Sequence, residues 1–214
     1  MLVSVCSIVM PHVILPAPSG RAKCRACKQS LPKAELRLGE EVPNAFGEGT
    51  ATHWYHLGCG ARRRPAAFLE AWAACQESLA ASEHPPDAEQ AKQWTDCAQL
   101  GIEFYRLCRF VRVESSPSGR ARCQGCRELI DKGALRFALE RIEDGMVSGA
   151  GFVHIGCAHA YAGAAEGIVA RVTALSDLSP EQWEAVRQAL ATQAQLPRQP
   201  PQPAAQKSAN PAET

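Results

Sequence analysis

The fold of this chain is decided by the stretch from Ser19 to Cys59, which contains two closely spaced pairs of metal-ligating residues. The first pair lies in Ser19-Gly-Arg-Ala-Lys-Cys24-Arg-Ala-Cys27, and after 28 residues the second follows in His56-Leu-Gly-Cys59. Three thiols and one imidazole, paired as Cys-x-x-Cys and His-x-x-Cys, are a tetrahedral ligand set for Zn²⁺. The stretch therefore predicts a zinc site on Cys24, Cys27, His56 and Cys59.

A second copy of the same pattern follows later in the chain. It reads Ser118-Gly-Arg-Ala-Arg-Cys123-Gln-Gly-Cys126 and, after 27 residues, His154-Ile-Gly-Cys157. The copies are offset by 99 residues at the first pair of ligands and by 98 at the second. Because the flanking Ser-Gly-Arg-Ala is repeated too, we interpret the pattern as an internal repeat with a second zinc site. Its ligands are Cys123, Cys126, His154 and Cys157.

The repeat also decides the expected domain organisation of the 214-residue chain. We expect a first zinc unit over residues 1–101, a second over 102–192, and a disordered tail over 193–214 that is rich in Pro, Gln and Ala. A unit of this size gains thin stability from a hydrophobic core alone, so a structural metal ion is a sensible supplement.

An extracellular disulfide framework is the alternative interpretation of the six cysteines in the two quartets. It leaves the matched histidines unexplained, and the apolar stretch of residues 1–10 lacks the basic start of a signal peptide. That stretch could be a strand, or an extension ahead of a start at Met10. No run approaches the length of a transmembrane helix. We expect two structural Zn²⁺ ions, no membrane partner, and an intracellular location: cytoplasm or nucleoid in a bacterium, nucleus in a eukaryote.

The net charge of +1 hides an uneven distribution of charged residues. Residues 19–64 carry nine Lys/Arg and four Asp/Glu, a balance of +5, and residues 106–157 carry nine against six, a balance of +3. The remainder holds five basic and twelve acidic residues, a balance of −7. Positive charge therefore gathers on the zinc units, which favours an acidic partner such as nucleic acid, although ordinary solvated surface is the alternative.

Short strands are expected around each site. Apolar residues 13–15 and 110–113 lead into the two Cys-x-x-Cys pairs. Residues 36–38 and 135–137 follow these pairs, and we expect their arginines, Arg37 and Arg136, to face outward. Loops rich in Gly, over residues 43–49 and 143–149, then lead to the ligand histidines.

Helices are expected after each site. Apolar residues recur there at helical spacing and predict packing faces: Phe68, Trp72, Cys75 and Leu79 in the first unit, and Tyr161, Ala165, Ile168 and Val172 in the second. Two capping boxes, Asp87-Ala-Glu-Gln90 and Ser179-Pro-Glu-Gln182, predict the starts of further helices, the first of which should stop at Gly101. The expected fold is a pair of small α+β zinc-binding domains, each a short antiparallel sheet with long loops and following helices.

The sequence Ser-Gly-Arg-Ala-x-Cys-x-x-Cys, then Leu-Arg, a loop and Trp-Tyr-His-x-x-Cys resembles the PARP-type zinc finger. This family occurs as a tandem pair in poly(ADP-ribose) polymerase and as a nick-sensing finger in a DNA ligase. The resemblance covers residues 19–59 closely and extends to 112–157, where Phe-Val replaces Trp-Tyr. The bulky aromatic residue that usually follows the last cysteine is replaced by Gly60 in one copy and by Ala158 in the other.

The resemblance implies binding to DNA strand breaks (nicks, gaps and ends) by shape rather than by base sequence. Arg21 and Arg120 match the family's arginine just before the first ligand, which lies on the phosphate backbone. Arg37 and Arg136 match the arginine of its Leu-Arg strand, which is also a DNA contact.

The loop before the histidine carries, in the family, apolar residues that stack on the base pair exposed at a break. Phe46, together with Ala51, is the candidate in the first copy, and Met146 and Val147 are the candidates in the second. Elementary physical chemistry supports this interpretation. A break exposes a base face that a small apolar group can cover, and arginines can neutralise the phosphates beside it. His53 is interpreted as a structural or surface residue, since the first quartet is complete without it.

We therefore expect a non-enzymatic, zinc-dependent protein that recognises DNA breaks in repair or damage signalling, with repair proteins as further partners. A zinc-scaffolded protein-interaction module without break specificity is the alternative. A hydrolytic zinc enzyme is disfavoured because four protein ligands close each site, whereas a catalytic site keeps an open position. No small-molecule substrate is expected.

Overall fold

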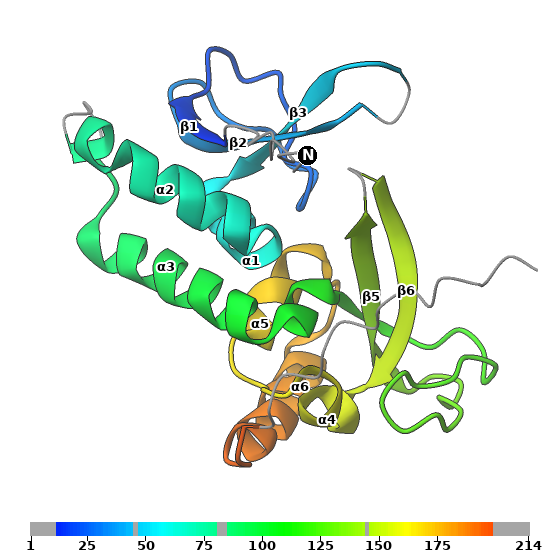
Figure 1. Cartoon of the computed structure of the whole chain (residues 1–214). Coiled ribbons are helices and arrows are strands. Elements are labelled where there is room, and N and C mark those ends of the chain that lie inside the picture. The colour runs from blue at the N-terminus through cyan, green and yellow to red at the C-terminus, as the bar shows by residue number, and fades with distance from the viewer. Residues whose placement is uncertain (1–11, 45–46, 81–84, 144–145, 199–214) are drawn as a thin grey trace, which may run out of the picture.

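Two three-stranded antiparallel sheets carry the two sequence repeats (Figure 1). The computed structural model describes residues 12–44, 47–80, 85–143 and 146–198. The first sheet consists of β1 (Val13–Pro16), β2 (Leu36–Pro43) and β3 (Thr50–His56), and the second of β4 (Phe110–Ser115), β5 (Leu135–Glu143) and β6 (Met146–His154). The central strand of each sheet is the second in chain order. The predicted strands are confirmed in both units.

Equivalent residues occupy equivalent places in the two sheets. The register pairs Arg37 with His56 in the first sheet and Arg136 with His154 in the second. Each ligand histidine is thus the last residue of its sheet's third strand, beside an arginine of the central strand. The alternation of a strand turns Leu38, next to Arg37, into the core.

Helices follow each sheet, as predicted. After the first sheet come α1 (Leu57–Arg63), α2 (Pro65–Ala80), α3 (Ala88–Glu103) and the 3₁₀ turn η1 (Tyr105–Arg109). After the second come η2 (Ile155–Cys157), α4 (Ala158–Ala162), α5 (Ile168–Val172), η3 (Thr173–Leu175) and α6 (Pro180–Ala194). Both predicted helix starts are confirmed: Asp87 accepts the backbone N–H of Gln90, and Ser179 forms a full capping box with Gln182.

Two expectations about glycine and helix length are wrong. Gly101 does not stop α3, which continues to Glu103. A Cβ at position 101 would lie 3.0 Å from Cys108 Sγ and 3.2 Å from Pro65 Cγ, so the glycine permits close packing. The stripe from Tyr161 to Val172 does not form one helix either. Gly163 and Gly167 adopt left-handed φ values of 88° and 74° and separate α4 from α5, although the apolar residues of the stripe are all buried.

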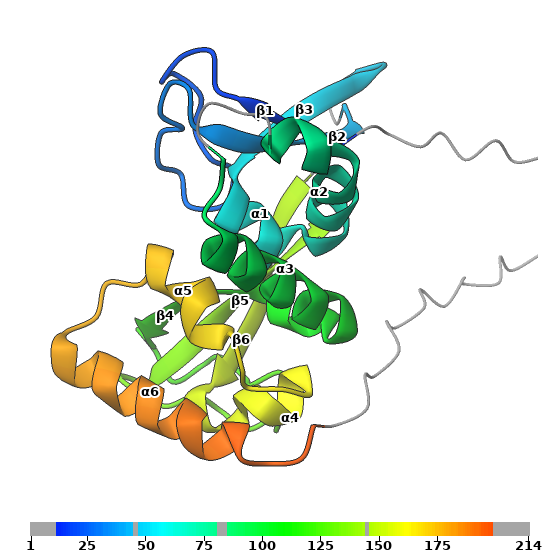
Figure 2. The same cartoon turned by 90° about the vertical axis from the view of Figure 1, so that its left-hand side faces the viewer.

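Helix α3 crosses the middle of the molecule, between α2 on one side and α5 and α6 on the other (Figures 1 and 2). Its residues contribute to two hydrophobic cores. Ala98 of α3 belongs to the first core, around Leu38, Tyr55 and Phe68. Two residues later in the same helix, Leu100 packs against the second core. The expected boundary between the units, at residue 101, falls within this helix.

Polar contacts join the two units as well. Arg63 of α1 donates to Glu140 Oε2 of β5 at 2.8 Å and to the carbonyl oxygen of Phe110 at 3.3 Å. Arg171 of α5 donates to the carbonyl oxygen of Cys97 in α3 at 2.9 Å. These contacts place the β5–β6 hairpin so that it reaches toward the first sheet (Figure 1).

Part of the segment expected to be a tail is described. Gln193 is buried, accepts the backbone N–H of His159 and donates to the carbonyl oxygen of Ile155. Arg198 lies 3.5 Å from Glu103 and 3.4 Å from Glu166. Residues 199–214 lie outside the described part of the chain. Within that part, no helix is both long and apolar enough to cross a membrane.

Candidate metal centres and nucleic-acid interface

The four ligands of the first repeat come together from separate elements. Cys24 and Cys27 lie on the tight turn that follows β1, His56 ends β3, and Cys59 lies in α1. Their ligand atoms are all within 4.8 Å of one another. His56 Nδ1 is 3.4 Å from Cys27 Sγ and 3.9 Å from Cys59 Sγ. The four side chains thus converge on one point where a tetrahedral cation fits.

The second repeat forms the same arrangement. Cys123, Cys126, His154 and Cys157 have ligand atoms within 4.8 Å of one another. His154 Nδ1 lies 3.4 Å from Cys126 Sγ and 3.8 Å from Cys157 Sγ. The backbone N–H groups of Gly125 and His154 donate to Cys123 Sγ at 3.3 and 3.4 Å. These donors stabilise a thiolate, which is the form that binds zinc.

A backbone carbonyl fixes the tautomer of each ligand histidine. His56 Nε2 lies 3.1 Å from the carbonyl oxygen of Ser30, and His154 Nε2 lies 3.2 Å from that of Leu129. A carbonyl only accepts, so Nε2 carries the proton and donates it. Nδ1, which faces the thiols, is then the lone-pair nitrogen that a metal needs.

The three thiols of each cluster oppose one another's ionisation. In the first site, the hydrogen bond from Cys59 and nearby backbone N–H groups lower the pKa of Cys24 to about 4, and that same hydrogen bond and burial raise the pKa of Cys59. In the second site, burial and the Cys123 thiolate raise the pKa of Cys157 to about 12. One thiolate therefore opposes the next, and a bound cation would stabilise all three.

The two sites are closed structural zinc centres by their donor set. Four protein ligands fill a tetrahedral shell, with thiolate in the majority. The cysteines of both quartets are free thiols rather than disulfides, which rules out the disulfide framework for them. The prediction of two zinc sites is confirmed at the level of ligand identity and convergence.

The expectation that Arg37 and Arg136 face outward is wrong. They are only 7% and 5% exposed, because each guanidinium lies flat on an aromatic ring of the neighbouring strand. Arg37 Cζ is 3.6 Å from the ring centroid of Trp54, and Arg136 Cζ is 3.4 Å from that of Phe152. Sequence alternation could not predict these aromatic rings, which cover the two guanidinium groups.

Glu114 completes the surroundings of Arg136. Arg136 Nη2 donates to Glu114 Oε1 at 2.7 Å, and Arg112 Nε donates to Oε2 of the same carboxylate at 2.7 Å. Burial acts to raise the pKa of Glu114, but these hydrogen bonds outweigh it and hold the pKa below its usual value. The first unit has no such carboxylate beside Arg37 among the described residues, and the Arg37 Nε has no partner there.

Arg21 and Arg120, the two candidates before the first ligands, are both exposed. The carboxylates of Glu40 and Glu41 have other partners among the described residues than Arg21. Glu40 instead accepts Arg64 Nε at 2.6 Å, and Glu41 accepts the hydroxyl of Thr50. Arg21 is therefore available to a ligand.

The apolar candidates are placed differently in the two units. Phe46 lies outside the described residues, and Ala51 is half-buried. Met146 and Val147, at the start of β6, are 57% and 45% exposed. Exposed neighbours of this size at a hairpin tip are suited to covering an apolar surface of a partner.

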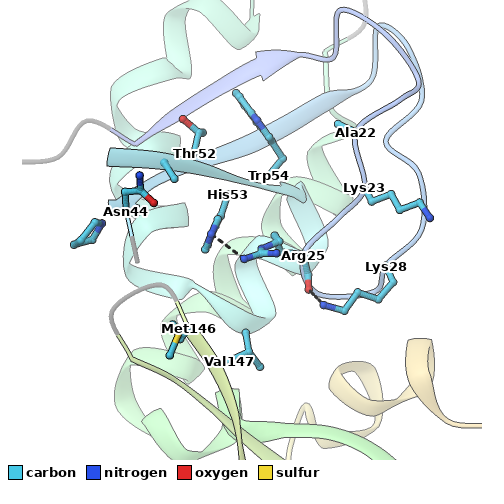
Figure 3. Close-up of a pocket in the computed structure, with 12 residues that line it drawn as sticks. Ala22, Lys23, Arg25, Lys28, Asn44, Thr52, His53, Trp54, Met146 and Val147 are labelled. Atoms are coloured by element: carbon cyan, nitrogen blue, oxygen red, sulfur yellow. Dashed lines mark hydrogen bonds between the residues drawn. The ribbon is translucent and has the colours of Figure 1, made fainter. Parts of the chain in front are cut away.

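Figure 3 shows a groove that sequence reasoning missed, between the first sheet and the tip of the second hairpin. We refer to it as the inter-unit groove; its volume is about 610 Å³. Lys23, Arg25 and Lys28 of the first unit line it, with Met146 and Val147 of the second unit on the other side. The basic composition of residues 21–28 indicated the cationic side of the groove. Nothing in the sequence indicated that Met146 and Val147 of the second unit would lie on the opposite side.

His53 orients one of these cations. Arg25 Nη2 donates to His53 Nε2 at 3.0 Å, which requires an unprotonated Nε2 (Figure 3). Burial and the charge of Arg25 both lower the pKa of His53 from 6.5, so the imidazole is neutral near pH 7. His53 was expected to be a structural or surface residue, and in the structure it positions the side chain of Arg25.

Gly60 explains one departure from the expected pattern. A Cβ at position 60 would lie 2.6 Å from Leu38 Cδ2, so Leu38 already fills the space beside α1. Its counterpart Ala158 is fully buried. Both positions after the last cysteine are thus closely surrounded in this chain.

The fold and the two sites define a small α+β protein with two Cys₃His zinc centres. Residues 16–94 match the family described as "Poly(ADP-ribose) polymerase and DNA-Ligase Zn-finger region". The match covers the first zinc site and the stretch in which the sequence motifs indicated the resemblance.

Curated relatives extend the match beyond that stretch. The chain is 28% identical over 135 residues to "Poly [ADP-ribose] polymerase" from Drosophila melanogaster, which covers 61% of this chain and 14% of the relative. It is 29% identical over 133 residues to "Poly [ADP-ribose] polymerase 1" from Gallus gallus, which covers 59% and 13%. The chain thus spans about one seventh or less of the length of these relatives, and it is similar to a small part of each.

Proposed function

We propose that this chain is a non-catalytic DNA-binding protein that recognises strand breaks through the phosphate backbone and the exposed base face. The family resemblance implies this activity, and both zinc sites have four protein ligands, which leaves no coordination position for a substrate. In this proposal zinc holds the two cysteine turns and the ends of the third strands in place. DNA binding in repair or damage signalling is then the work of the surrounding side chains.

The observation that carries the proposal is the charge of the two zinc turns. Residues 21–28 and 120–127 contain no Asp or Glu. Their cations are all exposed: Arg21, Lys23, Arg25, Lys28, Arg120, Arg122 and Arg127. Such a surface suits phosphates, and contacts of this kind fix position on DNA without reading the sequence.

Arg21 and Arg120 are the proposed phosphate contacts that the resemblance implies. We propose that Arg37 and Arg136 act indirectly, by holding Trp54 and Phe152 against the sheet beside the ligand histidines. Met146 and Val147 are the proposed apolar contacts with an exposed base.

The test is binding of the zinc-loaded protein to four DNAs of equal length, measured by fluorescence anisotropy at physiological salt. The DNAs are a duplex closed by hairpins at both ends, the same duplex with a nick, one with a short gap, and one with an open blunt end. Tighter binding to a broken form than to the closed duplex supports the proposal. Equal weak binding to all four would contradict it and favour a protein-interaction module instead.

Arg120→Ala is expected to weaken binding to all four DNAs and to reduce the slope of log K against log salt by about 0.9, the value for one lost phosphate contact on duplex DNA. An unchanged slope would remove Arg120 from the interface.

A further inference from the structure

The inter-unit groove has a basic wall of defined geometry. Arg25 is held by His53, and Lys28 Nζ donates to the carbonyl oxygen of Arg25 at 2.8 Å. Lys23 stands beside them (Figure 3). Among the described residues that line the groove there is no carboxylate. The wall is therefore complementary to an anion.

The opposite wall is apolar and comes from the other unit. Met146 and Val147 open β6 and are adjacent, exposed and large. The other exposed large hydrophobic residues of the described chain, such as Leu15 and Ile102, stand singly. An adjacent apolar pair across a groove from Arg25 and Lys28 has the two components of a single-strand site, which are cations for phosphates and an apolar platform for bases.

The two walls are held at a fixed separation. Glu140 belongs to β5, the strand that pairs with Met146 and Val147 of β6. The hydrogen bond that Arg63 donates to Glu140 therefore anchors the hairpin to α1. Arg171 adds a second contact between the units through the Cys97 carbonyl. The groove is thus formed before any ligand arrives, so little ordering entropy opposes binding.

The size of the groove decides between one strand and two. Its volume of about 610 Å³ lies within the range of roughly 300–1,000 Å³ typical of clefts and cavities that take one small ligand. A few nucleotides of one strand fill such a space, whereas a duplex needs an open face. Phosphates of an intact duplex can instead reach the outward cations Arg21 and Arg120.

We infer that the inter-unit groove binds unpaired nucleotides of one DNA strand at a break, with Lys23, Arg25 and Lys28 on the phosphates and Met146 and Val147 on a base. The inference rests on the proposed function and narrows it: breaks with an unpaired overhang are bound more tightly than blunt ends. The phosphate and base contacts for the same strand come from different units.

The test compares two DNAs that share one duplex, closed by a hairpin at one end. At the other end, one is blunt and the other carries a five-nucleotide 3′ or 5′ overhang. Fluorescence anisotropy is measured with the full zinc-loaded chain over a series of salt concentrations. Arg25→Ala should reduce the salt slope on the overhang DNA by about 0.7 more than on the blunt DNA, which is the single-strand value for one phosphate. Met146→Ser should weaken overhang binding at least about fivefold, as expected for one lost base contact.

Matched controls come from equivalent or similar positions outside the groove. Arg127→Ala removes an exposed cation from the second zinc turn, at the position that corresponds to Lys28. Ile102→Ser removes a large exposed hydrophobic residue from α3. Both controls should keep the ratio of overhang to blunt affinity. Zinc content and circular dichroism check that each variant is folded.

An overhang preference that Arg25→Ala and Met146→Ser remove, and the controls keep, supports the inference. Equal affinities for the two DNAs, or equal losses on both in the Arg25→Ala variant, overturn it. The closed duplex without ends distinguishes failure of this inference from failure of the proposed function. If the blunt-ended DNA binds more tightly than the closed duplex, the proposed function still holds. No preference for any broken form overturns both.

Discussion

At the scale of single residues, the pair of His53 and Arg25 can be followed directly. The pKa of His53 should lie below 6.5 in the folded protein, because burial and the Arg25 charge both disfavour the imidazolium. Removing that charge in Arg25→Ala should raise the pKa. An NMR titration of the His53 ring measures it, with Arg127→Ala as the control that leaves it unchanged. A value at or above 6.5, or no response to Arg25→Ala, would contradict the arrangement.

Arg136 allows stability and DNA binding to be separated. Arg136→Ala removes hydrogen bonds to Glu114 and Ser116 and the contact with Phe152, so the free energy of unfolding should fall by about 2 kcal/mol. Arg136→Lys should restore only part of this, because an ammonium cannot form the same fork. Urea unfolding of the zinc-loaded protein measures both.

Arg120→Ala is the matched control for that experiment. Its side chain is exposed, so the free energy of unfolding should change by less than about 0.5 kcal/mol while DNA affinity falls. A large loss of stability in Arg120→Ala, or none in Arg136→Ala, would show that burial has been assigned to the wrong arginine.

Residue chemistry that depends on local spacing was predictable from the sequence. The ligands of both sites were found because Cys-x-x-Cys and His-x-x-Cys fix two donors on one turn whatever the rest of the fold does. The burial of Arg37 was not found, since it depends on the ring of Trp54 two positions away on the neighbouring strand. Arg25 was missed as a groove residue for the same reason: its orientation depends on His53, which is 28 positions away in the chain.

At the scale of elements, Gly39 of β2 shows how closely the first sheet is packed. A Cβ at position 39 would lie 2.6 Å from Trp54 Cζ3 and 3.0 Å from Val13 Cγ2. Trp54 has little room to move, because Arg37 covers its ring. Gly39→Ala should therefore lower the free energy of unfolding by about 1–3 kcal/mol, the usual cost of overpacking.

Gly149 of β6 provides the control for Gly39. A Cβ there meets nothing within 4 Å, and the residue does not have a positive φ. Gly149→Ala should keep or slightly raise stability, because it removes freedom from the unfolded chain. Thermal unfolding monitored by circular dichroism compares the two variants, and equal effects would argue against close packing at position 39.

Elements with a local signal were predicted well, and those set by contacts were not. The capping boxes at Asp87 and Ser179 mark helix starts because the side chain satisfies a backbone N–H only a few residues away. The end of α3 was misplaced, since Gly101 is used for contact with Cys108 rather than for termination. The break between α4 and α5 was missed because apolar spacing continues through two glycines in the left-handed region.

At the scale of the whole molecule, the joint between the units can be broken and restored. Arg63→Glu places a second carboxylate beside that of Glu140. The repulsion between them should separate the hairpin from α1 and increase the radius of gyration measured by small-angle scattering. Adding Glu140→Arg should reverse the increase, because the pair is restored with exchanged charges. Arg187→Glu, on the exposed face of α6, is the control. No change with Arg63→Glu would show that the hydrogen bond does not hold the joint.

Loss of zinc from the first site should destabilise part of the second unit. Cys27 and Cys59 face Val111 and Arg171 across a small gap between the units. Cys24→Ala should unfold the first unit, since structural zinc contributes roughly 10–16 kcal/mol in zinc-finger peptides. Amide exchange should then rise in β4 and α5 as well, measured by mass spectrometry.

The reciprocal variant is the comparison for the first. Cys123→Ala should leave exchange in α2 unchanged, because α2 belongs to the first core and lies away from the second zinc site. Fast exchange confined to residues 12–101 in Cys24→Ala would contradict the coupling.

The course of α3 determines how this chain can be divided. A fragment that ends at residue 101 loses the last turn of the helix and uncovers Leu100, while a fragment that begins there lacks part of the surface on which its own core is built. Genetic exchange that moved one repeat without the other would therefore produce two poorly folded pieces. In this chain the two repeats are therefore expected to be stable together and not as separate fragments.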